Sequence, residues 1–228
     1  MTGPHAPRWP LVALVGVAVL GTALAGYLFA IDRPESSVAI VEGNSGPFRG
    51  NRLPPEIVGS RAPKFELADA EGGRLSTAQL AGEPYIVTFL YANCPDVCPL
   101  IADELRQTLA LLGPDAERPT VVAVSVDPKG DTAAVVRDFR ARHRLPENFR
   151  YLIGTESELK PVWDSYYAAP QIPGRADSAH SASIWLIDGD GRIRTKFSGG
   201  FPLPPADIAH DLQLLIDEQK RPNEGARR

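Results

Sequence analysis

The stretch that decides the fold is YIVTFLYANCPDVCP, residues 85–99. Its first seven residues are almost all apolar, as expected for a strand that is covered on both faces. Cys94 and Cys98, the only cysteines of the chain, follow directly. A cross-link between them would close a very small loop, which the chain-entropy model values at roughly 2 kcal/mol, against about 4.7 kcal/mol for a loop of about a hundred residues. The pair therefore favours chemistry at the sulfur atoms over a structural staple.

Prolines determine how the two thiols are presented. Cys94 and Cys98 each precede a proline, and a residue before proline is pushed out of the α region. We therefore expect both sulfur atoms on a loop, followed by a helix that begins at Pro99 and has Cys98 as its cap. Free N–H groups and the dipole at a helix start stabilise a thiolate, so at least one cysteine should have a lowered pKa. A strand, a loop with two thiols and a helix form the thioredoxin-like order.

Composition and charge limit the class of protein. The 228 residues carry a formal net charge of -4 and are 43% hydrophobic, which fits one ordinary domain plus additional segments. The mild acidity argues against a nucleic-acid partner. Residues 11–31 hold no charged side chain, and at about 1.5 Å per residue they match the roughly 30 Å of a bilayer core. We interpret them as one membrane anchor. A cleaved signal peptide is the alternative, although the apolar run is longer than such peptides usually have.

The orientation of this anchor is not fixed by the flanking charges, because Arg8 on one side is matched by Arg33 and Arg49 on the other. The short tail ahead of the anchor leaves the folded part on the far side. We therefore predict an extracytoplasmic domain, held at the plasma membrane if the organism is bacterial. The predicted parts are an N-terminal tail, the anchor, a linker, the domain and a polar tail, at residues 1–10, 11–31, 32–53, 54–221 and 222–228.

Hydrophobic periodicity divides the domain into strands and helices. Alternation at residues 65–67 ahead of the Gly72-Gly73 pair predicts a small N-terminal β-hairpin. The second of the longer helices is expected to have Asp131 as its cap. Further strands are expected at residues 85–91, 121–126, 151–153, 182–187 and 192–197, a helical turn at 76–80, and helices at 99–112, 133–143, 155–167 and from 204 onward. The predicted class is α/β, and the order is again thioredoxin-like.

Four histidines are candidates for a third ligand beside the two thiols. His5 precedes the anchor and is excluded by that position. His143 ends a predicted helix and His210 lies on the last one, which favours surface roles. His180 stands just before a predicted strand, where thioredoxin-like folds bring a loop against the cysteine loop. This position alone leaves open both a ligand role and a buried, hydrogen-bonded histidine.

Three motifs in the same order resemble the SCO/SenC family. They are YANCPDVCP at residues 91–99, VSVDP at 124–128 with Asp131-Thr132 after it, and HSA at 180–182 ahead of a strand and an Asp-Gly turn. The likeness covers about residues 58–217. It implies a thioredoxin-like domain held by one membrane helix, which binds copper and helps load the binuclear copper centre of cytochrome c oxidase. Carried over by position, the copper ligands are Cys94, Cys98 and His180, and the two cysteines form a redox disulfide.

Two residues depart from the family pattern. Asn93 stands where many members have a histidine before the first cysteine, and Ala179 stands where many have an aspartate before the ligand histidine. Ligating imidazoles usually donate their other N–H to a carboxylate or a carbonyl, so the second change removes such a partner of His180. Asp177 is the candidate replacement.

The ligand set implied by the resemblance agrees with the chemistry of copper. Two thiolates and one imidazole suit Cu(I) in a three-coordinate site and can also hold Cu(II). Structural zinc would normally require a fourth protein ligand. Asp96, between the thiols, and Asp127, at the end of the neighbouring strand, are candidates to tune the site. A turn residue and a strand-end cap are the alternative interpretations of these two aspartates.

The function that we predict is copper chaperoning, in which the ion passes by ligand exchange to a membrane-bound oxidase subunit without turnover. The enzymatic alternative is a membrane-tethered thiol-disulfide oxidoreductase, in which one cysteine attacks a partner's disulfide and the other resolves it. Other copper chaperones or thiol reductants would then be further partners. A peroxidase is disfavoured, because such enzymes usually carry a Thr where Tyr91 stands. A binding module with an inert disulfide is the third alternative.

Overall fold

The computed structural model describes residues 46–171, 183–198 and 204–220. They belong to one of the two compact units into which the chain divides, the unit from Val41 to Arg228. The predicted anchor at residues 11–31 lies outside the described residues. Within the described ranges, no helix has both the length and the apolar character needed to cross a membrane.

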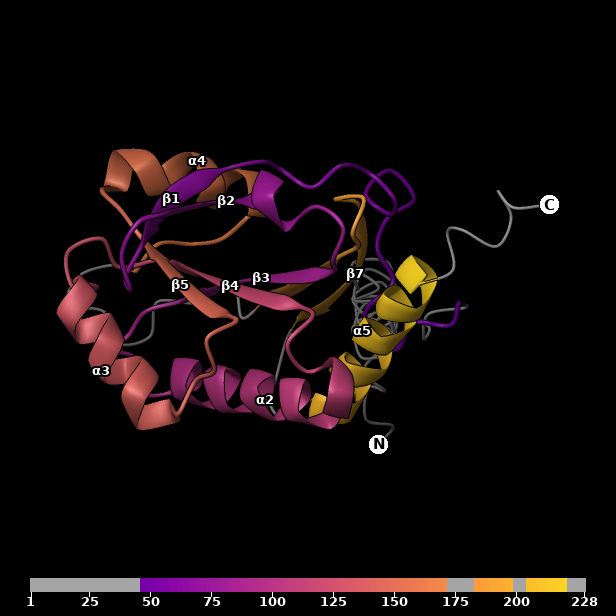
Figure 1. Cartoon of the computed structure of the whole chain (residues 1–228). Coiled ribbons are helices and arrows are strands. Elements are labelled where there is room, and N and C mark those ends of the chain that lie inside the picture. Colours follow the sequence, from indigo (N-terminus) through magenta and orange to yellow (C-terminus); the bar gives the residue numbers. More distant parts are fainter. Residues whose placement is uncertain (1–45, 172–182, 199–203, 221–228) are drawn as a thin grey trace, which may run out of the picture. The chain divides into compact units, whose positions relative to one another are not determined.

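In these ranges seven strands form one mixed sheet, in the spatial order β2-β1-β5-β4-β3-β6-β7 (Figure 1). The strands β3, β4 and β5 run parallel, and β6 and β7 continue the sheet with antiparallel pairing. On the other side, β1 pairs antiparallel with β5 and forms a hairpin with β2. The strands span Glu66–Asp69 (β1), Arg74–Ser76 (β2), Tyr85–Leu90 (β3), Thr120–Ser125 (β4), Phe149–Ile153 (β5), Ser183–Ile187 (β6) and Ile193–Ser198 (β7).

The strand β3 lies between β4 and β6, and all six of its side chains are buried. It has a paired strand on each edge and is covered on both faces, so its side chains can be apolar nearly throughout. Its last residue, Leu90, lies opposite Ser125 of β4, and the Leu90 carbonyl accepts a hydrogen bond from the N–H of Val126 at 2.9 Å. The chain therefore leaves β3 from a rigid position, immediately before Tyr91.

Helices cover the sheet on both faces. Figure 1 shows α2 and α4 on opposite sides of the central strands. The indole Nε1 of Trp163 donates to the carbonyl of Ser125 at 2.8 Å, which fixes α4 at the carboxyl end of β4. The helices span Val97–Leu111 (α2), Ala133–His143 (α3), Glu156–Tyr166 (α4) and Pro205–Lys220 (α5), with short 3₁₀ turns at Thr77–Leu80 (η1) and Gly113–Asp115 (η2). The predicted hairpin, strands and helices are confirmed, with boundaries that differ by one or two residues.

The predicted start of the first long helix was wrong. The helix α2 begins at Val97 with Asp96 as its cap, so Cys98 lies in the first helical turn and not on the loop. Pro99 is still tolerated, because the N–H groups of the first turn have no partner within a helix. The N–H of Cys98 uses this freedom to donate to Cys94 Sγ at 3.4 Å.

The predicted cap of α3 was also wrong. The cap is Thr132, whose side chain accepts from the N–H of Val135 at 3.3 Å. Asp131 is instead turned into the protein, where only 4% of its surface is exposed. There its carboxylate accepts hydrogen bonds from Ala92, Ser125 and Tyr151, which are described below.

Part of the segment that we assigned to the linker packs against the domain. The N–H of Asn51 donates to the Lys196 carbonyl at 2.7 Å, on the outer edge of β7. The carboxylate of Asp211, fully buried on α5, accepts from the N–H groups of Arg49 and Gly50 at 2.8 to 3.0 Å. The Asn51 contact occupies part of a strand edge that would otherwise offer free backbone groups, and the Asp211 contacts hold the same segment to α5.

Candidate metal centre

Cys94 and Cys98 lie together at the carboxyl end of β3. Cys94 belongs to a turn that its own N–H closes by donating to the carbonyl of Tyr91 at 3.2 Å. Both thiols are free, and 7% of Cys94 and none of Cys98 is exposed. Cys94 is therefore the sulfur that a metal ion or a partner protein reaches first.

The two thiols play different parts in the hydrogen bond between them, and their pKa values shift in opposite directions. The thiol of Cys98 donates to Cys94, and this bond is the main reason that the pKa of Cys94 falls to about 5, although burial opposes it. The backbone N–H groups of Cys98 and Asp96 contribute to the same lowering. The same thiol bond, together with burial, raises the pKa of Cys98 well above its ordinary range. Near neutral pH the pair therefore holds a thiolate at Cys94 and a proton at Cys98.

Tyr91 contacts both cysteines. Its hydroxyl donates to the sulfur of Cys94, and its backbone N–H donates to the sulfur of Cys98. The side chain is buried, with 4% of the residue exposed. Burial first, and then the bond to Cys94, raise the pKa of this hydroxyl well above its ordinary range. The hydroxyl therefore keeps its proton and acts as a donor at any physiological pH.

A buried carboxylate holds the turn that precedes Cys94. Asp131 Oδ1 accepts from the N–H of Ala92 at 2.8 Å, while Oδ2 accepts from the hydroxyls of Ser125 at 2.7 Å and Tyr151 at 2.9 Å. Burial raises the pKa of Asp131 to about 6, and these three hydrogen bonds oppose the increase. One side chain thus ties the cysteine turn to both β4 and β5.

Comparison with known proteins places this site in a family. The family model described as SCO1/SenC matches residues 58–217, well over half of the chain. The chain belongs to the SCO1/SenC family. This finding confirms the resemblance noted from the three sequence motifs.

Named relatives of this SCO1/SenC chain include the SCO1 protein homolog of Bacillus subtilis, 26% identical over 153 residues that cover 65% of this chain and 79% of that protein. The solved structure of Bradyrhizobium japonicum ScoI with copper bound is 29% identical, with a TM-score of 0.58 over 68% of this chain and 99% of that one. The structure of BsSco, described as a member of the Sco family of cytochrome c oxidase assembly proteins, has a TM-score of 0.61 at 24% identity, over 69% of this chain and 94% of that one. The predicted thioredoxin-like α/β fold is thereby confirmed, and copper is bound in one of these relatives.

Of the three predicted ligands, the structure brings Cys94 and Cys98 together. His180 lies outside the described residues, as do Asp177 and Ala179. Over the ranges that the structure covers, no group of three or more His, Cys, Asp or Glu side chains is arranged to hold a metal ion. The described part of this SCO1/SenC chain therefore supplies the thiol pair, and a ligand role for His180 stays a prediction.

The two aspartates predicted to tune the site differ in their surroundings. Asp96 is exposed, and its side chain makes no capping hydrogen bond to α2. Asp127 is half-buried, and its carboxylate accepts from the N–H of Gly130 at 2.9 Å, within the turn that follows β4. A side chain on Gly130 would overlap this carboxylate, so the turn needs glycine there. The contacts of Asp127 fit a strand-end turn, and a role of either aspartate toward a metal stays a prediction.

Two other histidines have carboxylate partners of their own. His143 Nδ1 lies 3.3 Å from Asp103 Oδ1, and its ring packs 4.5 Å from that of Phe139. His210 Nδ1 lies 2.9 Å from Asp211 Oδ1 on α5. These contacts account for both imidazoles without a metal, so His143 offers a control for experiments on His180.

Proposed function

We propose that this chain is a membrane-anchored copper chaperone, which binds the ion through Cys94, Cys98 and His180 and delivers it to the binuclear copper centre of cytochrome c oxidase. The observation that carries the proposal is the pair of free thiols at the carboxyl end of β3, in which the N–H of Cys98 donates to Cys94 Sγ at 3.4 Å. The copper in the ScoI relative supports it.

The two sulfur atoms and the imidazole are ligands that copper prefers. Two soft sulfur ligands and one imidazole suit Cu(I), and they can also hold Cu(II). Cys94 offers its thiolate without first losing a proton, whereas Cys98 must release its proton when it becomes a ligand. A site with three protein ligands leaves the ion open to an incoming ligand. This openness favours hand-over to the thiolates of a copper-receiving oxidase subunit by ligand exchange.

The unequal pair also supports a second function, thiol-disulfide exchange. The Cys94 thiolate attacks a partner's disulfide, which forms a mixed disulfide and expels one partner thiolate. Cys98 then loses its proton and attacks the sulfur of Cys94, which releases the second partner thiolate and leaves the Cys94–Cys98 disulfide. A thiol reductant must then restore the reduced pair. The two functions are compatible, because oxidase cysteines must be reduced before they receive copper.

Substitution of His180 separates these functions, since copper binding uses the imidazole whereas disulfide exchange needs only the thiols. We expect His180→Ala and His180→Asn to lower the Cu(I) affinity of the reduced full chain, kept in mild detergent, by at least the roughly 10- to 100-fold typical of changes around a metal ligand. His143→Ala is the matched control and should leave the affinity unchanged. Competition with a Cu(I) chelator measures the affinity, and reduction of a model disulfide measures exchange.

The outcome decides which function is primary. Loss of affinity with intact disulfide reduction supports the chaperone. Copper affinity within a few-fold of the parent in both His180 variants, together with lost disulfide reduction, would make the oxidoreductase the primary function.

We further propose that residues 11–31 anchor the chain in the plasma membrane of a bacterium, with the domain on the extracytoplasmic side. The uncharged span and the short tail ahead of it support this topology. Protease added to intact spheroplasts should digest the domain. Protection of the domain until the membrane is broken would reverse the orientation, and release of a soluble form that begins near Gly26 would favour a cleaved signal peptide.

A further inference from the structure

A cavity of about 130 Å³ lies at the end of β3 that is opposite the two cysteines. Its wall includes Tyr85, the first residue of β3, whereas Cys94 comes after the last residue of that strand. At about 3.3 Å per residue, the length of β3 alone puts roughly 17 Å between the cavity and the cysteine turn. The cavity is therefore separate from the candidate metal centre.

Tyr85 brings a nearly buried hydroxyl to the wall of this cavity, since only 4% of the residue is exposed. None of the described residues is hydrogen-bonded to this hydroxyl, and it is not one of the fully enclosed polar atoms that lack a partner, so it opens on the cavity. It depends on the content of the cavity for a hydrogen bond. Burial and the charge of Asp188, itself paired with Arg194 at 3.2 Å, raise the pKa of Tyr85 to about 12, so the hydroxyl is a donor at neutral pH.

Two cationic side chains line the same cavity. The guanidinium of Arg61 donates to the carbonyl of Asp190 at 2.9 Å, which uses one of its five N–H groups. Within the described ranges, the ammonium group of Lys64 has no hydrogen-bond or ion-pair partner. The carboxylate of Asp190 is the one negative group among the described residues of the lining. Two positive charges and one negative charge give the lining a net charge of +1.

These donors suit an anion with several oxygen atoms. A guanidinium can bind two phosphate oxygens side by side, an ammonium group binds phosphate as a point charge, and a phenol adds a neutral donor. We propose that the cavity between η1, β3 and the turn after β6 binds a phosphate group through Arg61, Lys64 and Tyr85. Pockets for whole ligands usually measure about 300 Å³ or more, so the remainder of a phosphorylated ligand extends into solvent. Free phosphate and the phosphate of a lipid headgroup share this chemistry.

The test follows the phenol of Tyr85 in the full chain, held in an uncharged detergent. Tyrosine labelled with ¹³C at Cζ gives one NMR signal for each tyrosine, and Tyr85→Phe identifies the signal of residue 85. Inorganic phosphate is titrated near neutral pH, at an ionic strength held constant with chloride. We expect the Tyr85 signal to move and to saturate. A signal that does not move, or that moves as far with acetate as with phosphate, overturns the proposal.

Lys64→Gln keeps the test decisive, because Lys64 is exposed and its replacement breaks no contact with a described residue. The loss of this charge should raise the half-saturating phosphate concentration about fivefold. Arg61→Gln should raise it about tenfold, because the guanidinium can supply two bonds.

Arg192→Gln is the matched control. Arg192 follows Gly191 of the cavity wall and donates to a backbone carbonyl, that of Gly59 at 2.8 Å, but does not line the cavity itself. Its replacement removes the same charge from the same end of the domain, and screening should keep the half-saturating concentration within about twofold of the parent. Equal effects of Lys64→Gln and Arg192→Gln would show general attraction of anions and overturn the site.

A second titration separates the two sources of phosphate. Lysophosphatidic acid is added to the same micelles, with lysophosphatidylcholine, whose phosphate is esterified on both sides, for comparison. Saturation of the Tyr85 signal by lysophosphatidic acid at a lower concentration than by inorganic phosphate assigns the site to a lipid headgroup. Saturation at the same or a higher concentration assigns it to free phosphate. Because copper takes no part, failure of this proposal leaves the proposed copper function unaffected.

Discussion

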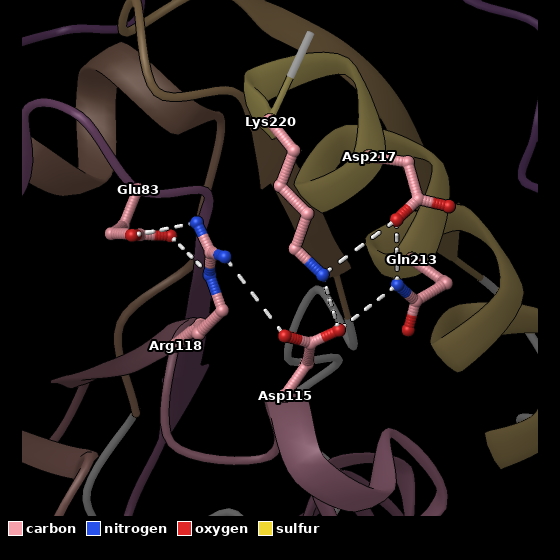
Figure 2. A network of polar contacts seen from close by, with 6 residues as sticks. All are labelled: Glu83, Asp115, Arg118, Gln213, Asp217 and Lys220. Atoms are coloured by element: carbon pink, nitrogen blue, oxygen red, sulfur yellow. Dashed lines mark hydrogen bonds and ion pairs between the residues drawn. The ribbon is translucent and has the colours of Figure 1, made fainter.

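The sulfur cluster at the carboxyl end of β3 and an ion-pair network between η2 and α5 are both built from polar side chains, but only the first is buried. In the network, which we call the clamp, Asp115 binds Lys220 at 2.8 Å and Arg118 binds Glu83 at 2.9 Å (Figure 2). Between 21% and 44% of each of these four side chains is exposed. The clamp consists of Glu83, Asp115, Arg118, Gln213, Asp217 and Lys220.

The two regions differ in burial, and their pKa values are shifted in different ways. In the clamp, the bond from Lys220 lowers the pKa of Asp115, and the bond to Glu83 raises that of Arg118, so each group is held in its ordinary charged state. In the sulfur cluster, two side chains of the same type share one proton, and their pKa values move in opposite directions. The partly exposed pairs therefore keep their groups in the ordinary charged state and add little to stability, whereas the buried thiol pair contains a reactive group.

The largest expected effect is in the reactivity of the two thiols. With the pKa of Cys94 lowered to about 5, this residue is still mostly a thiolate at pH 5.5, where an ordinary cysteine of pKa about 8.5 is almost fully protonated. After allowance for the lower nucleophilicity of a low-pKa thiolate, iodoacetamide should modify Cys94 roughly tenfold faster than an ordinary cysteine at that pH. Cys98 should stay unmodified, because it keeps its proton and is fully buried. The rate at Cys94 should fall as the pH decreases through about 5. Peptide mapping after timed alkylation measures both sites.

Denaturation supplies the control for this prediction. In urea the hydrogen bonds of the cluster are lost, and both thiols should react alike, with half-maximal rates near a pH of about 8.5. Equal reactivity of Cys94 and Cys98 in the folded, reduced chain would contradict the unequal sharing of the proton.

A smaller effect is expected from Asp131→Asn. The amide nitrogen cannot accept the hydrogen bonds that Ser125 and Tyr151 donate to Oδ2, so the free energy of unfolding of the reduced chain should fall by about 1–3 kcal/mol at pH 7. Because burial raises the pKa of Asp131 from 3.8 to about 6, this group makes the folded state lose stability as the pH rises through that window. The variant should lose this part of the pH dependence. Urea titrations at pH 4, 5 and 7 measure both effects.

The matched change in the clamp is Glu83→Gln, and it has the smallest expected effect. The Glu83–Arg118 pair is partly exposed, so its loss should reduce the free energy of unfolding by only about 0.2–1 kcal/mol. The difference from the parent should shrink further in about 1 M salt, which screens exposed charges. A cost equal to that of Asp131→Asn would remove the distinction between the two regions.

The sequence was sufficient to predict the fold and the position of the thiol pair. The apolar run at residues 85–91 and the adjacent cysteines are local patterns, and they predicted β3 and the position of Cys94 correctly. The start of α2 was misplaced because the rule for residues before proline disfavours helix at Cys98. The first helical turn tolerates Pro99, and it lets the Cys98 N–H reach Cys94.

The supporting residues could not be predicted in the same way. Asp131 resembles a helix cap from its sequence neighbours, and its actual partners at Ala92 and Tyr151 are distant along the chain. Tyr91 was expected at the end of the predicted strand and in the motif at residues 91–99, but its contacts with the two cysteines were not predicted. Long-range packing decides the role of Asp131, and periodicity carries no information about it.

The most direct test of the proposed function is the copper content of the full chain in its two redox forms. The chain is reduced or oxidised, exposed to a small excess of Cu(I) without oxygen, freed of unbound metal and analysed by elemental analysis. A thiolate committed to a disulfide cannot bind a metal, so we predict about one copper ion per reduced chain and almost none per oxidised chain. Equal copper uptake by the two forms would contradict the claim that Cys94 and Cys98 carry the ion.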